Sequence, residues 1–479
     1  MNWLAISPLL VVGAVVVVLL LVDVQWSPGP RLWALAAAAG AIGGTVASAF
    51  QWARHGGGEG SLAWDGMLAV DGFSAFAGML IFPIAGLALM GGWPLVRSLR
   101  RRGAEFVALV LIAAAGAHLM AASADLVMLF IALEVFSLSL YVLAGFTRGR
   151  ARSGEAALKY FLLGALASAI FLYGVALLFA ATGTTSIGGI ARYLNSTLLL
   201  RPGILLAGMA LTLVGLGFKV SAVPFHSWAP DVYQGAPGGI TAFLVASAKV
   251  GGFAALARVM TVALGSRLDD WAPALAAMAA ASIVIGTLFA LAQTDLKRML
   301  AYSGVAHAGF ILTALVGGAG IPDMWFYLAT YTVQVVGAFT VVALVSGMGP
   351  DEAPLTDYAG LAGRSPGLAA GLGLMMLAMG GIPLTAGFVG KVAVFRAAID
   401  GDHLWLVILA VVAAVAGLFA YLRVIVLMYM QPASGPSAGE SLPVPLAARL
   451  SLGAVAAVTV AAGVAPWPLL EWLGDALPL

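Results

Sequence analysis

Long, almost uninterrupted apolar runs are the feature that most constrains how this chain can fold. About fourteen runs reach the roughly 20 apolar residues that a helix needs to cross a bilayer core. Of the 479 residues, 62% are hydrophobic and only 9% are charged, whereas soluble domains carry about 25% charged residues. The sequence therefore predicts an all-α, polytopic membrane protein of about 14 transmembrane helices.

The segments between these runs are short, and none exceeds about 20 residues. Connections of this length leave no room for a soluble nucleotide-binding domain. The predicted spans are 3–22, 31–53, 67–92, 104–122, 124–146, 156–181, 203–223, 239–263, 272–292, 298–317, 324–347, 366–399, 404–430 and 448–466.

Basic residues are divided unevenly between the predicted loops, with twelve in odd-numbered loops and six in even-numbered loops. Because cytoplasmic loops carry the excess of Lys and Arg, we expect both termini on the outer, periplasmic side of a prokaryotic inner membrane. The odd-loop residues are Arg31, Arg97, Arg100, Arg101, Arg102, Arg148, Arg150, Arg152, Lys297, Arg298, Arg364 and Arg449. The even-loop residues are Arg54, Arg192, Arg201, Arg258, Arg267 and Arg396.

The residue types that are missing exclude several kinds of site. The sequence contains no cysteine, so it can hold no disulfide, iron–sulfur cluster or cysteine zinc site. The net charge is only +2 and there is no basic tract, which argues against a nucleic-acid partner. Neither a phosphate-binding glycine loop nor a metal-ligand cluster is present. We expect no cofactor and no metal in this chain.

Charged residues inside predicted spans are the first candidates for function. Five basic residues fall there: Lys159, Lys219, Lys249, Lys391 and Arg423, which include four of the five lysines. An intramembrane charge costs at least ~2.5–3.5 kcal/mol on insertion scales and by default indicates function. Lysine, unlike arginine, can give up and regain a proton when it is buried. Lys159 lies near a span end, where the alternative is a side chain that extends to the headgroups.

Glu134 is the only carboxylate in the middle of a predicted span. A carboxylate at that depth needs a proton or a cation, and we expect Lys219 to be its partner; a neutral Glu134 bonded to backbone is the alternative. His307 also lies mid-span, either as a titratable relay or as a satisfied core histidine. His226 and Tyr302 could bridge the charged residues through water.

Polar residues inside the spans recur at nearly one offset. Glu134 to His307 is 173 residues, Lys219 to Lys391 is 172, and Lys249 to Arg423 is 174. Each step covers five predicted helices, and because five is odd, the second copy would have the opposite membrane orientation. We expect two inverted five-helix repeats. The expected divisions are 1–103 for helices 1–3, 104–265 and 266–430 for the repeats, and 431–479 for the C-terminal helix.

Each expected repeat contains a broken helix. Pro224 follows Lys219 and would free the carbonyl of Val220, four residues before it. The run 366–399 would form a helix of about 51 Å, longer than a core of ~30 Å, and it is interrupted by two glycines and Pro383. Matched, interrupted segments that carry lysines are typical of an ion path; ordinary proline kinks are the alternative.

Several motifs within residues 125–400 carry a resemblance to a known family. They are LEVFSLSLY at 133–141, EAALKYFLLG at 155–164, FK at 218–219 with PFHSWAPDVYQGAP at 224–237, QTDLKRMLAYS at 293–303 and GIPLTAGF at 381–388. The chain resembles the antiporter-like membrane subunits of respiratory complex I, the NADH:quinone oxidoreductase. Among them it is most similar to subunit N.

The resemblance implies a membrane-arm subunit of a proton-translocating NADH:quinone oxidoreductase. NADH, FMN, iron–sulfur clusters and quinone would be held by partner subunits, and other membrane subunits and lipid would surround the chain. By resemblance, Glu134 and Lys219 match the family's glutamate–lysine pair, Lys249 its central lysine and Lys391 its terminal lysine. Lys159, His226 and Tyr302 match less certain family positions, and Arg423 is included from the repeat alone.

Two other functions remain open from the sequence. The chain could be a stand-alone antiporter that exchanges a cation such as Na⁺ for H⁺, in which case the isolated chain would transport ions. It could also be a membrane scaffold whose charges only pair helices. Lysine variants would then damage assembly instead of transport.

Overall fold

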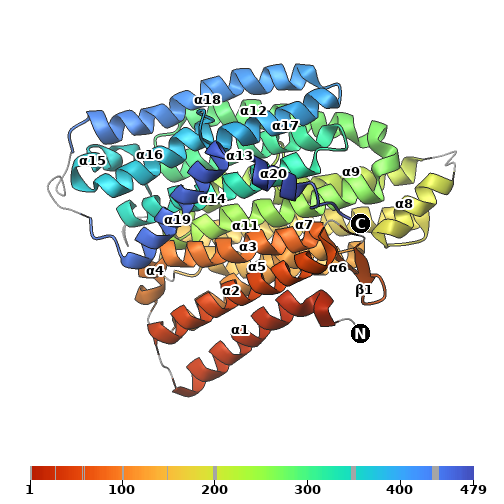
Figure 1. Cartoon of the computed structure of the whole chain (residues 1–479), viewed down its shortest axis with the longest axis horizontal. Coiled ribbons are helices and arrows are strands. Elements are labelled where there is room, and N and C mark those ends of the chain that lie inside the picture. The colour runs from red at the N-terminus through yellow and green to blue at the C-terminus, as the bar shows by residue number, and fades with distance from the viewer. Residues whose placement is uncertain are drawn as a thin grey trace.

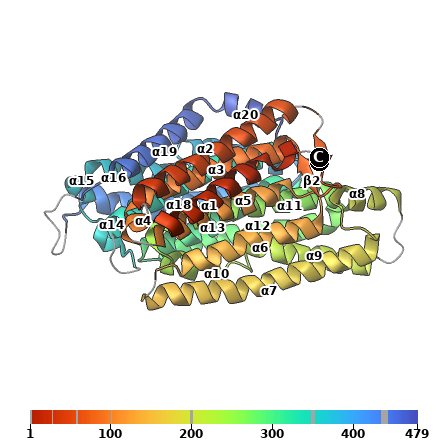
Figure 2. The ribbon, with the colours of Figure 1, turned by 90° about the horizontal axis from the view of Figure 1, so that it is seen from below.

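The computed structural model describes residues 3–26, 29–56, 58, 60–99, 102–147, 149–197, 202–346, 352–433 and 442–479. Long helices run side by side along the long axis of the molecule (Figures 1 and 2). One short antiparallel hairpin, β1 (Ser61–Ala63) with β2 (Leu68–Val70), lies at one end. The all-α class is confirmed. Of the loop arginines counted above, Arg100, Arg101, Arg148 and Arg201 lie outside the described residues.

Twelve helices within the described residues are long and apolar enough to cross a membrane. They are α1 (Ser7–Trp26), α2 (Pro30–His55), α3 (Gly72–Gly91), α5 (Gly103–Ala122), α6 (Leu126–Ala144), α7 (Ala151–Thr182), α11 (Gly238–Ala257), α12 (Leu268–Ala292), α13 (Leu296–Val316), α14 (Ile321–Ser346), α18 (Leu404–Met430) and α19 (Leu446–Val464). Short helices are α4 (Trp93–Ser98), α8 (Ile187–Ser196), α15 (Leu361–Arg364) and α20 (Trp467–Leu473). Single turns lie at η1 (Trp3–Ile6), η3 (Arg258–Ala263), η4 (Gly265–Arg267) and η5 (Leu355–Tyr358).

The two remaining predicted spans, 203–223 and 366–399, contain shorter helices that end at a break. The first contains α9 (Gly203–Lys219), which α10 (Trp228–Gly235) follows after the break, and the second consists of α16 (Pro366–Gly380) and α17 (Ala386–Asp400). Both breaks lie at the positions that proline and glycine predicted in the sequence. Proline ends a helix because it removes a backbone donor and clashes with the preceding turn. The backbone of Ser221 (φ 58°) and Leu384 (φ 69°) turns left-handed inside the breaks.

Burial separates central helices from peripheral ones. The most apolar stretch of α11 is 100% buried and that of α13 is 94% buried, whereas those of α1 and α19 are 28% and 22% buried. The peripheral helices expose large apolar side chains such as Leu21 and Leu446, as expected for surfaces that face lipid. Lys249 on α11 and His307 on α13 are accordingly enclosed by protein.

Two connections of the same design lie at opposite ends of the molecule. Near α8, Leu126 donates its backbone N–H to Thr185, and Ile187 donates to Ala124. Near α15, Leu296 donates to Ala353, and Leu355 donates to Thr294. Asp125 caps α6 in the first and Asp295 caps α13 in the second. In both views α8 and α15 lie at opposite ends (Figures 1 and 2).

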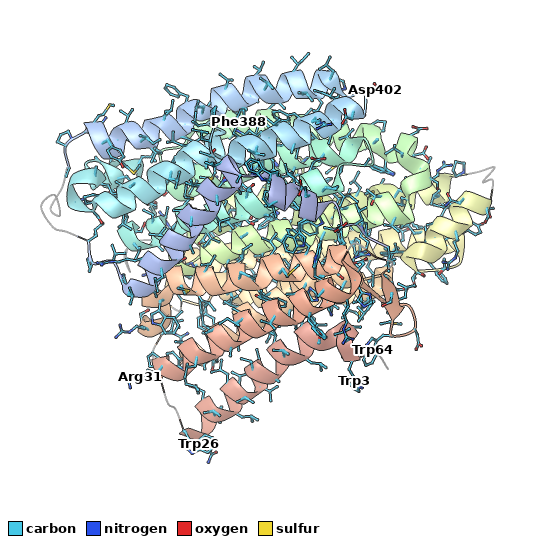
Figure 3. All side chains as sticks on the ribbon, in the orientation of Figure 1. Trp3, Trp26, Arg31, Trp64, Phe388 and Asp402 are labelled. Atoms are coloured by element: carbon cyan, nitrogen blue, oxygen red, sulfur yellow. The ribbon has the colours of Figure 1, made fainter. Side chains whose placement is uncertain are left out.

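The two ends also differ in their labelled side chains (Figure 3). Arg31 and Trp26 lie at one end, and Trp3, Trp64 and Asp402 lie at the other. Trp3 and Trp64 pack edge to face, with ring centroids 6.0 Å apart. We call these the Arg31 end and the Trp3 end; α4 and α15 lie at the Arg31 end, and α8 lies at the Trp3 end.

Arg258 corrects one part of the loop count, because it is not a loop residue. It is 2% exposed and holds Asp71 through two bonds, Nη1 to Oδ2 at 2.8 Å and Nη2 to Oδ1 at 3.0 Å. Its Nε donates to the carbonyl of Ala121. The backbone N–H of Leu479 donates to Asp71 at 3.0 Å, so this buried pair also ties down the C-terminal tail.

Candidate functional site

Lys219 is the last residue of α9 and is 1% exposed. Its Nζ donates to the hydroxyl of Ser137 on α6 at 2.6 Å. Four aromatic rings surround the ammonium group, with centroids 5.6–5.9 Å away; they belong to Phe136, Tyr141, Tyr160 and Phe218. Rings at this distance attract a cation through their electron-rich faces.

The expected Glu134–Lys219 ion pair is not formed in the structure. Lys219 bonds Ser137, which follows Glu134 by three residues on α6 and so lies on the same side of that helix. Oε1 of Glu134 is buried and has no hydrogen-bond partner within the described residues. Glu134 and Lys219 therefore lie near each other, but Lys219 donates its hydrogen bond to the hydroxyl of Ser137 and not to the carboxylate of Glu134.

Lys249 lies on α11, where it is fully buried. Its Nζ donates to the carbonyl of Val220, the first residue after α9. This is the carbonyl that Pro224 was predicted to free. The broken helix therefore supplies an acceptor for a lysine, although the lysine that uses it is Lys249 and not its neighbour Lys219.

Lys391 lies on α17 and faces back to the broken end of α16. Its Nζ donates to the carbonyls of Met379 at 3.1 Å and Gly380 at 2.9 Å, and the ring of Phe310 lies 5.2 Å away. Helix C-termini carry partial negative charge on their free carbonyls. The broken end of α16 is thus a site for a cation.

Gly381 makes room for Lys391. Its φ of 82° is left-handed, a conformation that costs other residues energy. A Cβ at this position would lie 2.9 Å from Cδ and 3.0 Å from Nζ of Lys391. Both the backbone angle and the close approach require glycine here.

Lys219 and Lys391 do not occupy equivalent places in the two broken helices. Lys219 precedes its break, whereas Lys391 follows the other break and lies within α17. The 172-residue offset therefore does not superpose these two lysines. The two breaks share one feature: a lysine from another helix donates a hydrogen bond to a backbone carbonyl that the break leaves free. Lys249 donates to Val220, and Lys391 donates to Met379 and Gly380.

His307 is buried on α13 and both ring nitrogens have partners. Nδ1 lies 2.8 Å from the hydroxyl of Tyr327, and Nε2 lies 3.1 Å from that of Tyr421. The Tyr421 hydroxyl lies 2.5 Å from Ser303, and the ring of Tyr331 stacks on the imidazole at 4.4 Å. The histidine is satisfied, and its partners form a hydroxyl chain that can carry a proton.

A small cavity joins His307 to Lys391. Its volume is about 20 Å³, and both residues line it together with Ser303 and Tyr421. About 10–15 Å³ is enough for one water molecule when polar partners are present. One water in this cavity could connect the imidazole network to the lysine.

His226 and Tyr302 lie apart from that network. His226 follows the break in α9, and its Nδ1 is buried without a hydrogen-bond partner in the described structure. Tyr302 stacks on Phe289 at 5.3 Å, and the guanidinium of Arg298 lies 5.8 Å from its ring.

Lys159 lies in the first third of α7, and its side chain is 44% exposed. It forms ion pairs with Glu155 at 2.7 Å and Asp231 at 3.0 Å, and Asp231 also pairs with Arg298 at 2.8 Å. Partial burial alone would raise the pKa of Asp231, but its bonds to Arg298 and Lys159 lower it. The next residue, Tyr160, places its ring 5.8 Å from Nζ of Lys219. A single side chain, that of Tyr160, therefore separates this cluster of ion pairs from the buried Lys219.

Arg423 lies away from the lysines' carbonyl partners. Its guanidinium donates to the carbonyls of Leu291 and Gln293 at the end of α12. Free carbonyls at a helix C-terminus commonly bind arginine in this way. The structure does not bring Arg423 together with Lys249, its counterpart in the sequence offset.

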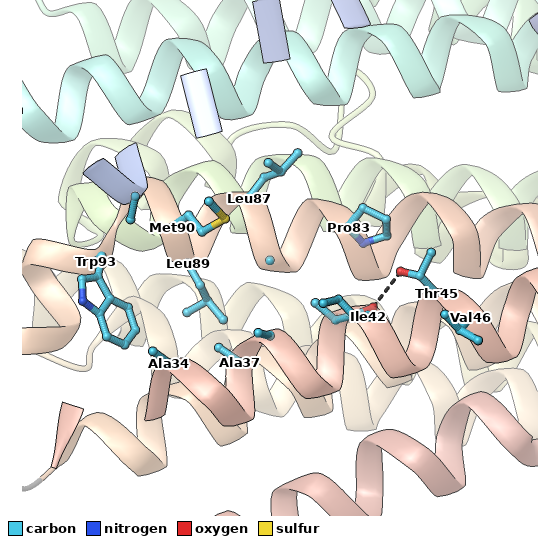
Figure 4. Close-up of a pocket in the computed structure, with 14 residues that line it drawn as sticks. Ala34, Ala37, Ile42, Thr45, Val46, Pro83, Leu87, Leu89, Met90 and Trp93 are labelled. Carbon is cyan, nitrogen blue, oxygen red and sulfur yellow. Dashed lines mark hydrogen bonds between the residues drawn. The ribbon is translucent and has the colours of Figure 1, made fainter. Parts of the chain in front are cut away.

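The apolar pocket in Figure 4 is separate from these groups. It has a volume of about 540 Å³ and lies between α2, α3 and the start of α19. Its lining includes Ala37, Ile42, Pro83 and Trp93 and contains no charged residue. It offers no chemistry to the lysines.

The fold and the buried lysines can now be set against known proteins. A family model described as NADH:quinone oxidoreductase/Mrp antiporter, TM matches residues 123–417, which include both broken helices and Lys219, Lys249 and Lys391. The chain belongs to this family. The family match confirms the resemblance seen in the motifs.

Relatives named as subunit N match over most of this antiporter-like chain. It is 45% identical over 403 residues to NADH-quinone oxidoreductase subunit N of Mycobacterium tuberculosis, covering 82% of this chain and 75% of that one. It is 36% identical over 483 residues to subunit N of Trichlorobacter lovleyi, covering 100% and 97%. Relatives from two genera thus share this similarity to subunit N.

Solved structures show the same fold. A chain of respiratory complex I from Thermus thermophilus matches with a TM-score of 0.83 at 35% identity, covering 98% of this chain and 99% of that one. A chain of the Mrp complex from Dietzia matches with a TM-score of 0.85, covering 99% and 97%. Its 21% identity supports a common fold only.

Several residues of this antiporter-like site escaped the sequence analysis. Ser137 and Tyr160 beside Lys219, and Tyr327 and Tyr421 beside His307, are neutral and common in membrane helices. Their spacing in the sequence reaches 114 residues. A weak signal existed for Tyr160, because it adjoins Lys159 in a quoted motif.

Proposed function

We propose that this chain translocates protons as a membrane-arm subunit of an NADH:quinone oxidoreductase, through its buried lysines. The observation that carries the proposal is the environment of Lys219, Lys249 and Lys391. Each is buried, and each Nζ bonds a neutral hydroxyl or carbonyl oxygen at or beside a broken helix. A lysine without a fixed counter-ion can exchange its proton.

Buried polar atoms without protein partners mark the route between the lysines. Buried polar groups normally have partners, so such atoms are sites for bound water. In the described structure these atoms include the hydroxyls of Tyr141, Tyr160, Ser221, Tyr233 and Tyr331. Tyr141 and Tyr160 contact Lys219, and Tyr331 stacks on His307. Water on these hydroxyls would give a continuous proton path.

The path would consist of two half-channels, one in residues 104–265 and one in 266–430. The matched connections at Asp125 and Asp295, at opposite ends of the molecule, support an inverted repeat. Lys219 would serve the first half-channel and Lys391 the second. Lys249, on the fully buried α11, would join them.

We place the Arg31 end in the cytoplasm and both termini on the periplasmic side. Arg31, Arg298 and Arg364 belong to loops or helix ends on the cytoplasmic side, and cytoplasmic segments carry the positive excess. Trp3 and Trp26 lie near the two ends of α1 (Figure 3). Tryptophan is enriched at both membrane–water interfaces, so these residues agree with an α1 that spans the membrane. The Lys159–Asp231 cluster would then receive protons from the cytoplasm.

Energy for transport would come from outside the chain. Moving one proton against the membrane potential costs ~2.3 kcal/mol per 100 mV. The sequence has no cysteine for an iron–sulfur cluster. NADH, FMN, iron–sulfur clusters and quinone would belong to partner subunits, and redox-driven movement of Glu134 relative to Lys219 would set the charge on the lysine.

The test replaces Lys219 in one variant and, as a matched control, replaces a cation elsewhere in the chain in another. Lys219→Ala is introduced into the assembled complex, and Arg423→Met serves as the control because Arg423 caps α12 away from the lysines. Proton uptake by inside-out vesicles is measured with NADH oxidation in the same sample. We expect Lys219→Ala to lose proton uptake with the complex still assembled, and Arg423→Met to retain both.

Each other outcome identifies a different function. Normal pumping by Lys219→Ala would refute the path. Loss of the complex in both variants would indicate a scaffold whose charges only pair helices. Cation/proton exchange by the isolated chain in liposomes would favour the stand-alone antiporter.

A further inference from the structure

A groove that is open to the exterior lies between α16 and α19, and none of the lysines lines it. Its volume is about 740 Å³, and its lining includes Arg364, Leu368, Leu374, Arg449 and Leu452. Arg364 ends α15, and Arg449 lies in the first turn of α19. α15 and the start of α16 lie at the Arg31 end in both views (Figures 1 and 2).

The mouth of the groove is positively charged. Arg364 donates one Nη2 bond to the backbone carbonyl of Asp357 at 3.0 Å, and its Nε is buried without a partner. Arg449 is exposed. No carboxylate is among the described residues that line the groove. Neither guanidinium group forms an ion pair with a carboxylate of the described residues, and two such groups attract an anion that offers several oxygen acceptors.

Below the arginines the groove is apolar and short. Pro366 to Leu374 on α16 covers about 12 Å of helical rise, and Arg449 to Ala456 on α19 covers about 10 Å. Half of a bilayer core is about 15 Å, so the apolar part of the groove fits within the depth of one leaflet. A transmembrane helix from a neighbouring subunit would need a face about twice as long.

We propose that this groove binds one anionic phospholipid of the leaflet at the Arg31 end. Its phosphate lies between Arg364 and Arg449, and an acyl chain lies along Leu368, Leu374 and Leu452. Basic pockets between membrane helices on the cytoplasmic side are suited to anionic headgroups. The first turn of α19 has no side-chain cap, and its free N–H groups add to the positive end of the groove.

Two glycines give a matched pair of blocking variants. Gly453 lines the groove, and a Cβ built there meets no atom within 4 Å. Gly13 on the peripheral α1 has equally open surroundings. Gly453→Phe therefore adds a ring to the groove from a position where the Cβ is unobstructed, whereas Gly13→Phe adds the same ring to a different apolar face.

The experiment titrates the purified full-length chain with dioleoyl-phosphatidylglycerol or dioleoyl-phosphatidylcholine and counts bound lipid by native mass spectrometry. Two basic residues near a membrane surface favour an anionic lipid by about thirtyfold, at ~1 kcal/mol each. We expect that preference in the natural chain and its loss in the Arg364→Gln/Arg449→Gln double variant. Arg97→Gln, an exposed arginine of α4 at the same end, should retain it. Gly453→Phe should weaken binding of both lipids at this site, and Gly13→Phe should not.

Equal binding of the two lipids by the natural chain would overturn the proposal. Unchanged preference in the double variant would overturn it as well. If the double variant keeps its lipid but loses a neighbouring subunit on purification of the complex, the groove is a protein interface. Retained proton pumping in every groove variant is compatible with the lipid site, because the groove residues lie outside the proposed proton path.

Discussion

The buried Asp71–Arg258 pair gives the sharpest prediction about stability. Asp71 accepts four bonds: two from the Arg258 guanidinium, one from the backbone of Ser74, and one from the backbone of Leu479. Asp71→Asn keeps the shape of the side chain and removes the charge. One of its two oxygens becomes an NH₂ donor, which can no longer accept the N–H groups that point at it.

The magnitude follows from the bonds that are lost. If the amide nitrogen takes the place of Oδ2, the bonds from Nη1 of Arg258 and from Leu479 both disappear. Hydrogen bonds to charged groups contribute about 1.5–3 kcal/mol each, and breaking a buried ion pair by removing one partner costs about 3–5 kcal/mol. We expect Asp71→Asn to lower the free energy of unfolding by about 4 kcal/mol. An Asp71→Leu/Arg258→Met double variant should recover most of this, because no buried charge remains unpaired.

Equilibrium unfolding in mixed micelles, followed by tryptophan fluorescence, measures the effect. Burial alone would raise the pKa of Asp71, but Arg258 lowers it below the usual value of 3.8. The stabilisation is therefore fully present above pH 3.8 and is lost only as the pH falls through the lowered pKa. A loss of less than about 1 kcal/mol for Asp71→Asn at pH 7, or no recovery in the double variant, would refute the reasoning.

Three further predictions concern the breaks and the surface cluster. Gly381→Ala should reduce proton pumping with assembly intact, because the left-handed φ and the contact with Lys391 cost about 1–3 kcal/mol; Gly371→Ala, whose Cβ meets open space, should pump normally. Ser282→Ala leaves the backbone N–H of Val223 without its 2.8 Å partner, and unfolding should show a loss of about 1–3 kcal/mol. Asp231→Asn should cost less than about 1 kcal/mol in the same assay because the pair is partly exposed. Since Asp231 has a lowered pKa, its contribution should be constant at neutral pH and disappear only as the pH falls through that lowered pKa.

The sequence predicted features that depend on local chemistry. The breaks after Lys219 and at Gly380–Gly381 follow from proline and glycine, which act on their own turn. The acceptor of Lys249 is a carbonyl freed in this way. Burial of lysines followed from hydropathy, because a span of apolar residues must enclose any charge within it.

Features that depend on helix rotation were beyond the sequence. Whether Lys219 bonds Glu134 or Ser137 is decided by how α6 turns toward α9, and the two candidates are only three residues apart. Arg258 was counted as a loop residue although it lies within the predicted span 239–263. Its partner Asp71 lies 187 residues away, and no local pattern connects them.

Helix caps give a different alignment of the two halves from that of the charged residues. Asp125 caps α6 and Asp295 caps α13 with the same backbone connections around them, and they are 170 residues apart. At that offset His307 corresponds to Ser137, the direct partner of Lys219, and Glu134 corresponds to Gly304.

Under the proposed inverted repeat, this alignment makes the two halves electrically unequal. The first half has a carboxylate one turn from the partner of its lysine, whereas the cap-equivalent position of the second half holds glycine. Lys391 is held by the carbonyl dipoles of α16, which are fixed by the backbone and cannot move as a carboxylate side chain can. If charge on the lysines is set by a mobile counter-ion, that control enters at Glu134, and Lys391 responds only through the protons that reach it along Lys249 and His307.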